Sequence, residues 1–171
     1  MARRSAGLVV VTATERLILE TLARTVPAAA VSYEQCLLDL GGPQRRSYRG
    51  VAHELREVLR ETLNYLAPDA EVMATPGFTL EKDMDRPTQR QKALHVLRKR
   101  NLSREEMSAP GLTVTLVEET AATITRVAYT QGSKNAHTES SQASVRQLKM
   151  YVDAILGELL EIHGQKSPRA R

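Results

Sequence analysis

Two stretches of the sequence repeat aliphatic residues every three or four positions, and this periodicity constrains the fold more than any other feature. The stretches cover residues 51–66 and 145–162, and their apolar positions are Val51, Leu55, Val58, Leu59, Leu63 and Leu66, then Val145, Leu148, Val152, Ile155, Leu156, Leu159 and Ile162. Residues at this spacing lie on one face of an α-helix, which has to be buried against another element. The sequence therefore predicts long amphipathic helices that pack together.

Proline, glycine and capping residues divide the rest of the chain. Pro27 should end a first helix, residues 68–87 should form a long loop, and Ser103 opens a capping-box pattern that the following Pro110–Gly111 pair should keep short. We expect further helices at residues 12–26, 32–40, 88–100 and from 112 onward. No pair of strands stands out, so the predicted fold class is all-α, a compact bundle of about five to seven helices.

The composition agrees with a helical domain. The 171 residues include no Trp and a single Phe, so the core has to be built from Leu, Val, Ile and Ala. We predict one domain over residues 1–163 and a disordered basic tail at 164–171. The single cysteine, Cys36, lies in an apolar stretch and is expected to be a buried hydrophobe. No segment is typical of a signal peptide or a membrane span, so we expect a cytoplasmic protein.

The usual enzyme motifs are missing, and one polar segment carries the main candidate site. Four scattered histidines have no ligand spacing, so we predict no metal and no cofactor. The segment TQGSKNAHT, residues 130–138, separates two long predicted helices and places His137 at or just before the last one. A neutral imidazole there could take a proton from a ribose 2′-hydroxyl, with polar neighbours holding the phosphate. The simpler alternative is a capping loop with an incidental surface histidine.

A polar loop that ends in His between two long helices resembles the HEPN superfamily of helical ribonucleases, whose hallmark is an Arg, four to six residues and a His. More narrowly, SYRGVAHELREVLRETLNYLAPDAEVM, KALHVLRKR and YTQGSKNAHT resemble small bacterial predicted nucleases that accompany PIWI-like modules. The resemblance covers about Tyr48 to Ile162. It implies an endoribonuclease in defence against phage or mobile elements, acting as a homodimer and restrained by an NTPase or PIWI-like partner.

The same resemblance implies roles for individual residues. His137 matches the hallmark His, whereas the hallmark Arg position holds Gln131, which offers hydrogen bonds but no charge. Arg126 or Lys134 would then have to supply the charge. The remaining implied residues are Ser133 and Asn135, which would position the phosphate, and Thr138, which would contact RNA.

A rival site and a basic run complete the candidates. Arg46 and His53 also have the hallmark spacing, with Arg49 between them, although His53 begins an ordinary amphipathic helix. The basic run between Arg86 and Arg104 contains no acidic residue, and its RNA-binding candidates are Arg90, Lys92, Arg98, Lys99 and Arg100. Without aromatic residues it should read the backbone of a nucleic acid only. A solvated helix face, or a surface for an acidic partner, explains the run equally well.

Three functions remain open on these residues. The first is a metal-independent endoribonuclease of HEPN type. The second is a non-catalytic helical subunit that binds a protein or a nucleic-acid backbone, which Gln131 favours. The third is a DNA nuclease, although the acidic pairs, such as Asp83 with Asp85, are not arranged as metal-dependent nucleases usually arrange them.

Overall fold

The computed structural model describes residues 11–42, 47–130 and 137–162. This part of the chain is helical and contains no strand, which confirms the all-α prediction. The helices are α1 (Ala13–Thr25), α2 (Pro27–Gly41), α3 (Arg49–Leu66), α4 (Asp69–Met73), α5 (Gln89–Lys99), α6 (Ser108–Thr130) and α7 (His137–Leu159). None of them is both long enough and apolar enough to cross a membrane.

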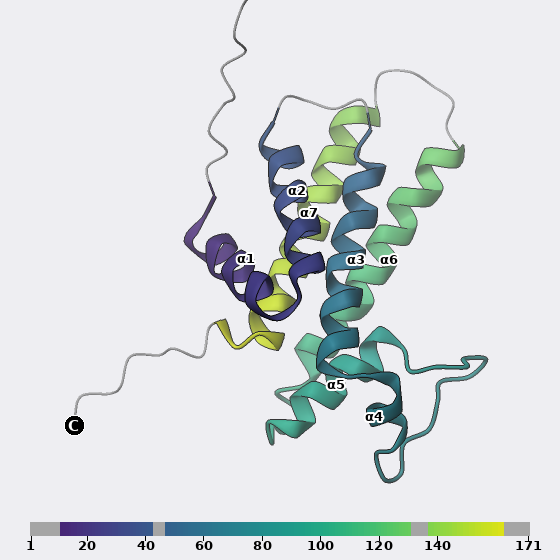
Figure 1. The fold of residues 1–171 in the computed structure, drawn as a ribbon. Helices are drawn as coiled ribbons and strands as arrows, with labels where there is room; N and C mark the ends of the chain where they lie inside the picture. The colour runs from purple at the N-terminus through teal and green to yellow at the C-terminus, as the bar shows by residue number, and fades with distance from the viewer. Residues whose placement is uncertain (1–10, 43–46, 131–136, 163–171) are drawn as a thin grey trace, which may run out of the picture.

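The long helices stand side by side, with the short ones gathered at one end (Figure 1). α3 packs against α2, α6 and α7, while α1 packs against α2 and α7. α3 and α6 run in opposite directions, so α3 begins, α6 ends and α7 begins at the same end of the bundle, which we call the α6–α7 end (Figure 1). α4 and α5 lie at the other end, which we call the α5 end.

The two predicted apolar stripes form the centre of the core. In α3 the stripe is buried from Val51 to Leu63, and in α7 it is buried from Val145 to Leu159. Leu66 and Ile162, at the ends of the stripes, are partly buried against the same core. Cys36 is fully buried, as predicted, and burial raises the pKa of its thiol to about 12. The periodicity in the sequence therefore identified the faces that hold the bundle together.

Two helix boundaries differ from the predicted ones, and one short helix was not predicted. α2 begins at Pro27 rather than near residue 32, because proline can end one helix and occupy the first position of the next. α4 is a short helix within the predicted loop at 68–87. α6 begins at Ser108, so the Pro110–Gly111 pair lies in its first turn instead of ending a short helix. Amide groups in a first turn have no acceptor within the helix, so proline is tolerated there.

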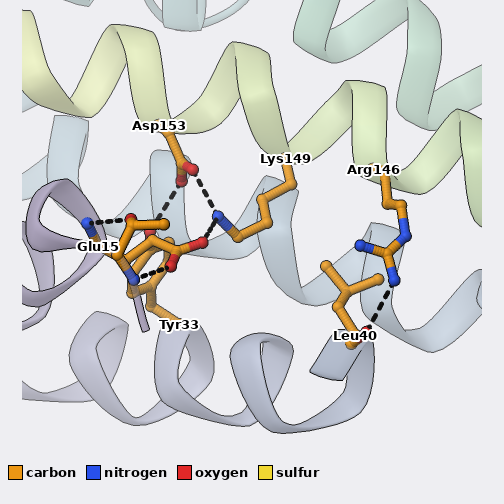
Figure 2. A network of polar contacts seen from close by, with 7 residues as sticks. Glu15, Tyr33, Leu40, Arg146, Lys149 and Asp153 are labelled. Carbon is orange, nitrogen blue, oxygen red and sulfur yellow. Dashed lines mark hydrogen bonds and ion pairs between the residues drawn. The ribbon is translucent and has the colours of Figure 1, made fainter. Parts of the chain in front are cut away.

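A partly buried polar network ties α1, α2 and α7 together (Figure 2). Lys149 of α7 forms ion pairs with Glu15 of α1 and with Asp153, whose carboxylate lies 2.5 Å from the ammonium nitrogen. The hydroxyl of Tyr33 in α2 donates a hydrogen bond of 2.8 Å to Asp153. Glu15 also completes a capping box with Thr12, so the same carboxylate starts α1 and anchors it to α7.

The two carboxylates of this network are shifted in opposite directions. Burial raises the pKa of Asp153 above its usual range, even though the attraction of Lys149 opposes the shift. Burial also acts on Glu15, but hydrogen bonds from Lys149 and from the Thr12 backbone outweigh it and lower the pKa of Glu15. The ammonium of Lys149 therefore favours the charged form of both acids, but at Asp153 the effect of burial is larger.

Candidate functional site

The main candidate site lies at the α6–α7 end. His137 is the first residue of α7, so its predicted position at the start of the last helix is confirmed, and Thr138 follows it in the same helix. Four other candidates lie outside the described residues, namely Gln131, Ser133, Lys134 and Asn135. Arg126 lies on α6, one turn before the end of that helix, and is exposed.

A pocket of about 330 Å³ opens between α3 and α6, and we call it the α3–α6 pocket. Its lining consists of three basic side chains, one acidic side chain and three small residues. The lining residues are His53, Arg56, Glu118, Ala121, Ala122, Thr125 and Arg126. The pocket thus brings together Arg126, a candidate of the His137 loop, and His53, the histidine of the rival site. In the sequence these two residues belonged to competing sites.

Arg56 and Glu118 are the pocket residues that the sequence analysis missed. The Nε–H group of Arg56 donates a hydrogen bond of 2.8 Å to Glu118 across the gap between α3 and α6. In the sequence, Arg56 stands among charges of alternating sign on one helix face, and Glu118 stands next to Glu119 as one of the acidic pairs. No signal in the sequence pairs them, because only the packing of two distant helices brings them together.

The other residues of the rival site lie at the same end of the molecule. Arg49 is the first residue of α3 and is exposed, and His53 follows one turn later on the same helix. Arg46 lies outside the described residues. Because α3 begins where α7 begins, Arg49 and His53 lie at the same end of the bundle as His137 (Figure 1).

The basic run lies at the opposite end, on α5 and the loops beside it (Figure 1). Lys92 is only 3% exposed, and it pairs with Asp69 and donates a hydrogen bond of 2.5 Å to Asn64. Lys99 is exposed but forms an ion pair of 2.5 Å with Glu71. These two lysines therefore brace α3, α4 and α5, and Lys92 offers no accessible surface to a nucleic acid.

Arg100 has a different structural task. Its guanidinium donates a hydrogen bond of 2.7 Å to the Glu158 carbonyl and one of 2.5 Å to the Leu159 carbonyl. Both carbonyl groups belong to the last turn of α7. Carbonyl groups at a helix end lack partners within the helix, and a cation there also favours the helix dipole. Besides Lys99, four members of the basic run are exposed on the surface, namely Arg86, Arg90, Arg98 and Arg104.

Replacing Arg100 with alanine is expected to lower the free energy of unfolding by about 2 kcal/mol, because two charge-assisted hydrogen bonds to α7 are lost. Chemical denaturation followed by circular dichroism would measure the change. Arg98→Ala, which removes an exposed arginine two residues away, is the matched control and should change stability by less than about 0.5 kcal/mol. Equal losses in the two variants would show that Arg100 does not cap α7.

Of the remaining titratable groups, His95 is nearly buried within the α5 end. Its Nε2 atom lies 3.1 Å from Glu71 and its Nδ1 atom lies 3.2 Å from the hydroxyl of Thr75. Hydrogen bonds from Lys99 and His95 lower the pKa of Glu71. Within the described ranges, no three His, Cys, Asp or Glu side chains gather closely enough to hold a metal ion.

Comparison with known protein families identifies the family of this chain. Residues 17–159 match the family described as predicted pPIWI-associating nuclease. The chain belongs to this family. The match runs from α1 to the end of α7 and includes both the α3–α6 pocket and His137. No curated protein and no solved structure matches the chain.

Membership of the predicted pPIWI-associating nucleases confirms the narrower of the two resemblances found in the sequence. The family description names a nuclease and an association with a PIWI-type protein. It does not name the nucleic acid or the catalytic residues. Those have to be argued from the α6–α7 end.

Proposed function

We propose that this protein is a metal-independent endoribonuclease of HEPN type that acts in bacterial defence against phage or mobile elements. One observation carries the proposal: His137 begins α7 at the end of the bundle where Arg126 and His53 line one pocket. Basic side chains and a histidine, both needed for cleavage of a phosphodiester without metal, thus lie on neighbouring helix ends. The family description, a predicted nuclease, supports the same class of activity.

In this mechanism His137 takes the proton from a ribose 2′-hydroxyl as that oxygen attacks the adjacent phosphate. The P–O bond to the 5′-oxygen breaks, and this oxygen takes a proton from water as it leaves. The products are a 2′,3′-cyclic phosphate and a 5′-hydroxyl, and His137 returns its proton to the solvent. Ser133 and Asn135 position the phosphate, and Arg126 and Lys134 stabilise the negative charge that develops on it. Gln131 contributes a hydrogen bond in the position where HEPN enzymes carry an arginine.

The proposal includes an assembly. A homodimer would place two α6–α7 ends together in a composite site, and a PIWI-like protein or an NTPase would hold the activity in check. The family description supports the PIWI-type partner. RNA is the substrate of the proposal, because only RNA carries the 2′-hydroxyl that this mechanism uses.

The proposal is tested by incubating the purified protein with mixed tRNA and mRNA in EDTA. We expect cleavage that survives the chelator and leaves a 2′,3′-cyclic phosphate on one fragment and a 5′-hydroxyl on the other. Labelling of the 5′-hydroxyl would detect the second fragment. A single-stranded DNA with the sequence of one of these tRNAs is the matched control and should stay intact. Cleavage that stops in EDTA, or equal cleavage of the DNA, would contradict a metal-independent ribonuclease.

A second function is favoured by Gln131, which leaves the hallmark position without a charge. In that case the protein is a non-catalytic subunit, and its working surface is the α5 end, where Arg90, Arg98 and Arg104 are exposed. Charge reversal at Arg98 and Lys99 would then abolish function in a phage-challenge assay, whereas His137→Ala would have no effect.

A further inference from the structure

The α3–α6 pocket contains more than the proposed cleavage step uses. Of the residues that line this pocket, the proposed cleavage step uses only Arg126. The lining also includes His53, Arg56 and Glu118, together with three small residues. We propose that this pocket binds a phosphodiester group of single-stranded RNA beside the one that is cleaved, and that Glu118 competes with that phosphate for Arg56. The inference rests on the proposed ribonuclease function.

The charge and shape of the pocket suit a phosphate. Two guanidinium groups and an imidazole reach it from two helices, and a guanidinium can bind two phosphate oxygens at once. Ala121, Ala122 and Thr125 carry short side chains, which leave space beside the longer ones for a compact group. The volume of about 330 Å³ accommodates a phosphate and part of its sugar.

The position of the pocket suits a strand that continues to His137. Arg126 lies four residues before the end of α6, a rise of about 6 Å along the helix. A strand whose scissile phosphate lies beside His137, at the same end of the bundle, can therefore place a neighbouring phosphate in the pocket. Single strands are flexible enough to follow such a path, and a backbone contact of this kind carries no sequence preference.

Glu118 is the internal competitor for this phosphate. Its carboxylate accepts the Nε–H group of Arg56 at 2.8 Å, and the two side chains are 32% and 45% exposed. An exposed ion pair of this kind contributes little to stability, so exchanging the carboxylate for a phosphate is not opposed strongly. A guanidinium carries five N–H donors, so the bond to Glu118 also leaves Arg56 able to meet a second anion.

The test measures binding rather than cleavage. A fluorescein-labelled, single-stranded oligoribonucleotide of about 12 nucleotides is titrated with the full chain carrying His137→Ala, in EDTA, and fluorescence anisotropy reports Kd. Arg56→Gln is expected to weaken binding about fivefold and to reduce the slope of log Kd against log salt by about 1. Arg60→Gln, which changes an arginine of similar exposure paired with Glu57 on the same helix, is the control and should change Kd less than about twofold.

Glu118→Gln gives the decisive arm, because a gain in affinity cannot come from misfolding. It is expected to tighten binding about threefold, whereas Glu119→Gln, the exposed neighbour, should leave Kd unchanged. Unchanged affinity in Glu118→Gln, or equal losses in Arg56→Gln and Arg60→Gln, would overturn the inference. Competition by an acidic peptide as effective as unlabelled RNA would also overturn it. Because the protein in this assay cannot cleave, these results stand apart from those of the EDTA cleavage assay.

Discussion

Replacing His137 with alanine is expected to slow RNA cleavage by about 10²–10⁴-fold while the helical circular dichroism spectrum stays unchanged. The size of the loss is that of a general base removed from a reaction that has no metal to replace it. His137 is the first residue of α7, where alanine continues the helix without difficulty. Single-turnover rates at saturating RNA, in EDTA, would measure the change.

His53→Ala is the matched control for this experiment. Under our proposal His53 lines the phosphate pocket, so its loss should raise KM and leave kcat within about threefold of the wild type. The opposite pattern, with kcat lost in His53→Ala and kept in His137→Ala, would move the catalytic centre to the start of α3. Full cleavage by both variants would exclude either histidine as the base.

Replacing Lys149 with methionine is expected to lower the free energy of unfolding by about 3 kcal/mol. Methionine preserves the packing of the aliphatic stem, but it leaves Glu15 and Asp153 facing each other without the cation that both carboxylates contact. Thermal and chemical denaturation would measure the loss. Met150→Ala, at an exposed neighbouring position on the same helix, should change stability by less than about 0.5 kcal/mol.

Two further measurements separate charge from packing at Lys149. Adding Glu15→Gln and Asp153→Asn to Lys149→Met should recover most of the lost stability, because no buried charge then lacks a partner. The loss in the single variant should also be larger at neutral pH than in mildly acidic buffer. Burial, no longer opposed by Lys149, raises the pKa of folded Asp153 further, so the folded state binds a proton more tightly than the unfolded chain and stability falls as the pH rises. A loss that is independent of pH and not recovered would attribute the effect to packing.

Much of the bundle could be predicted because helical periodicity is a local signal. The stripe of α7 and the capping box at Ser103 are complete within a few residues of sequence, and the structure confirms both. The start of α6 could not be predicted in this way. At Gly111 a Cβ atom would lie 3.2 Å from the side chain of Leu94, so this glycine makes a close contact with another helix that no local pattern shows.

The candidate site was predictable only in its separate parts. His53 and Arg126 were each noticed from the sequence, but only the antiparallel packing of α3 and α6 shows that they line one pocket. In the basic run, the sequence analysis predicted more accessible charge than the structure shows. A count of charges cannot show that Lys92 is buried beside Asp69 and Asn64, or that Arg100 caps α7.

The bond between Lys149 and Glu15 joins residues 134 positions apart. During synthesis, α1 can pack against α2 as soon as both helices have left the ribosome, but its ion pair with α7 cannot form until Lys149 has emerged. His137 begins the same helix. The helix that carries the proposed base therefore joins the bundle in the same step that completes the ion pair with Glu15.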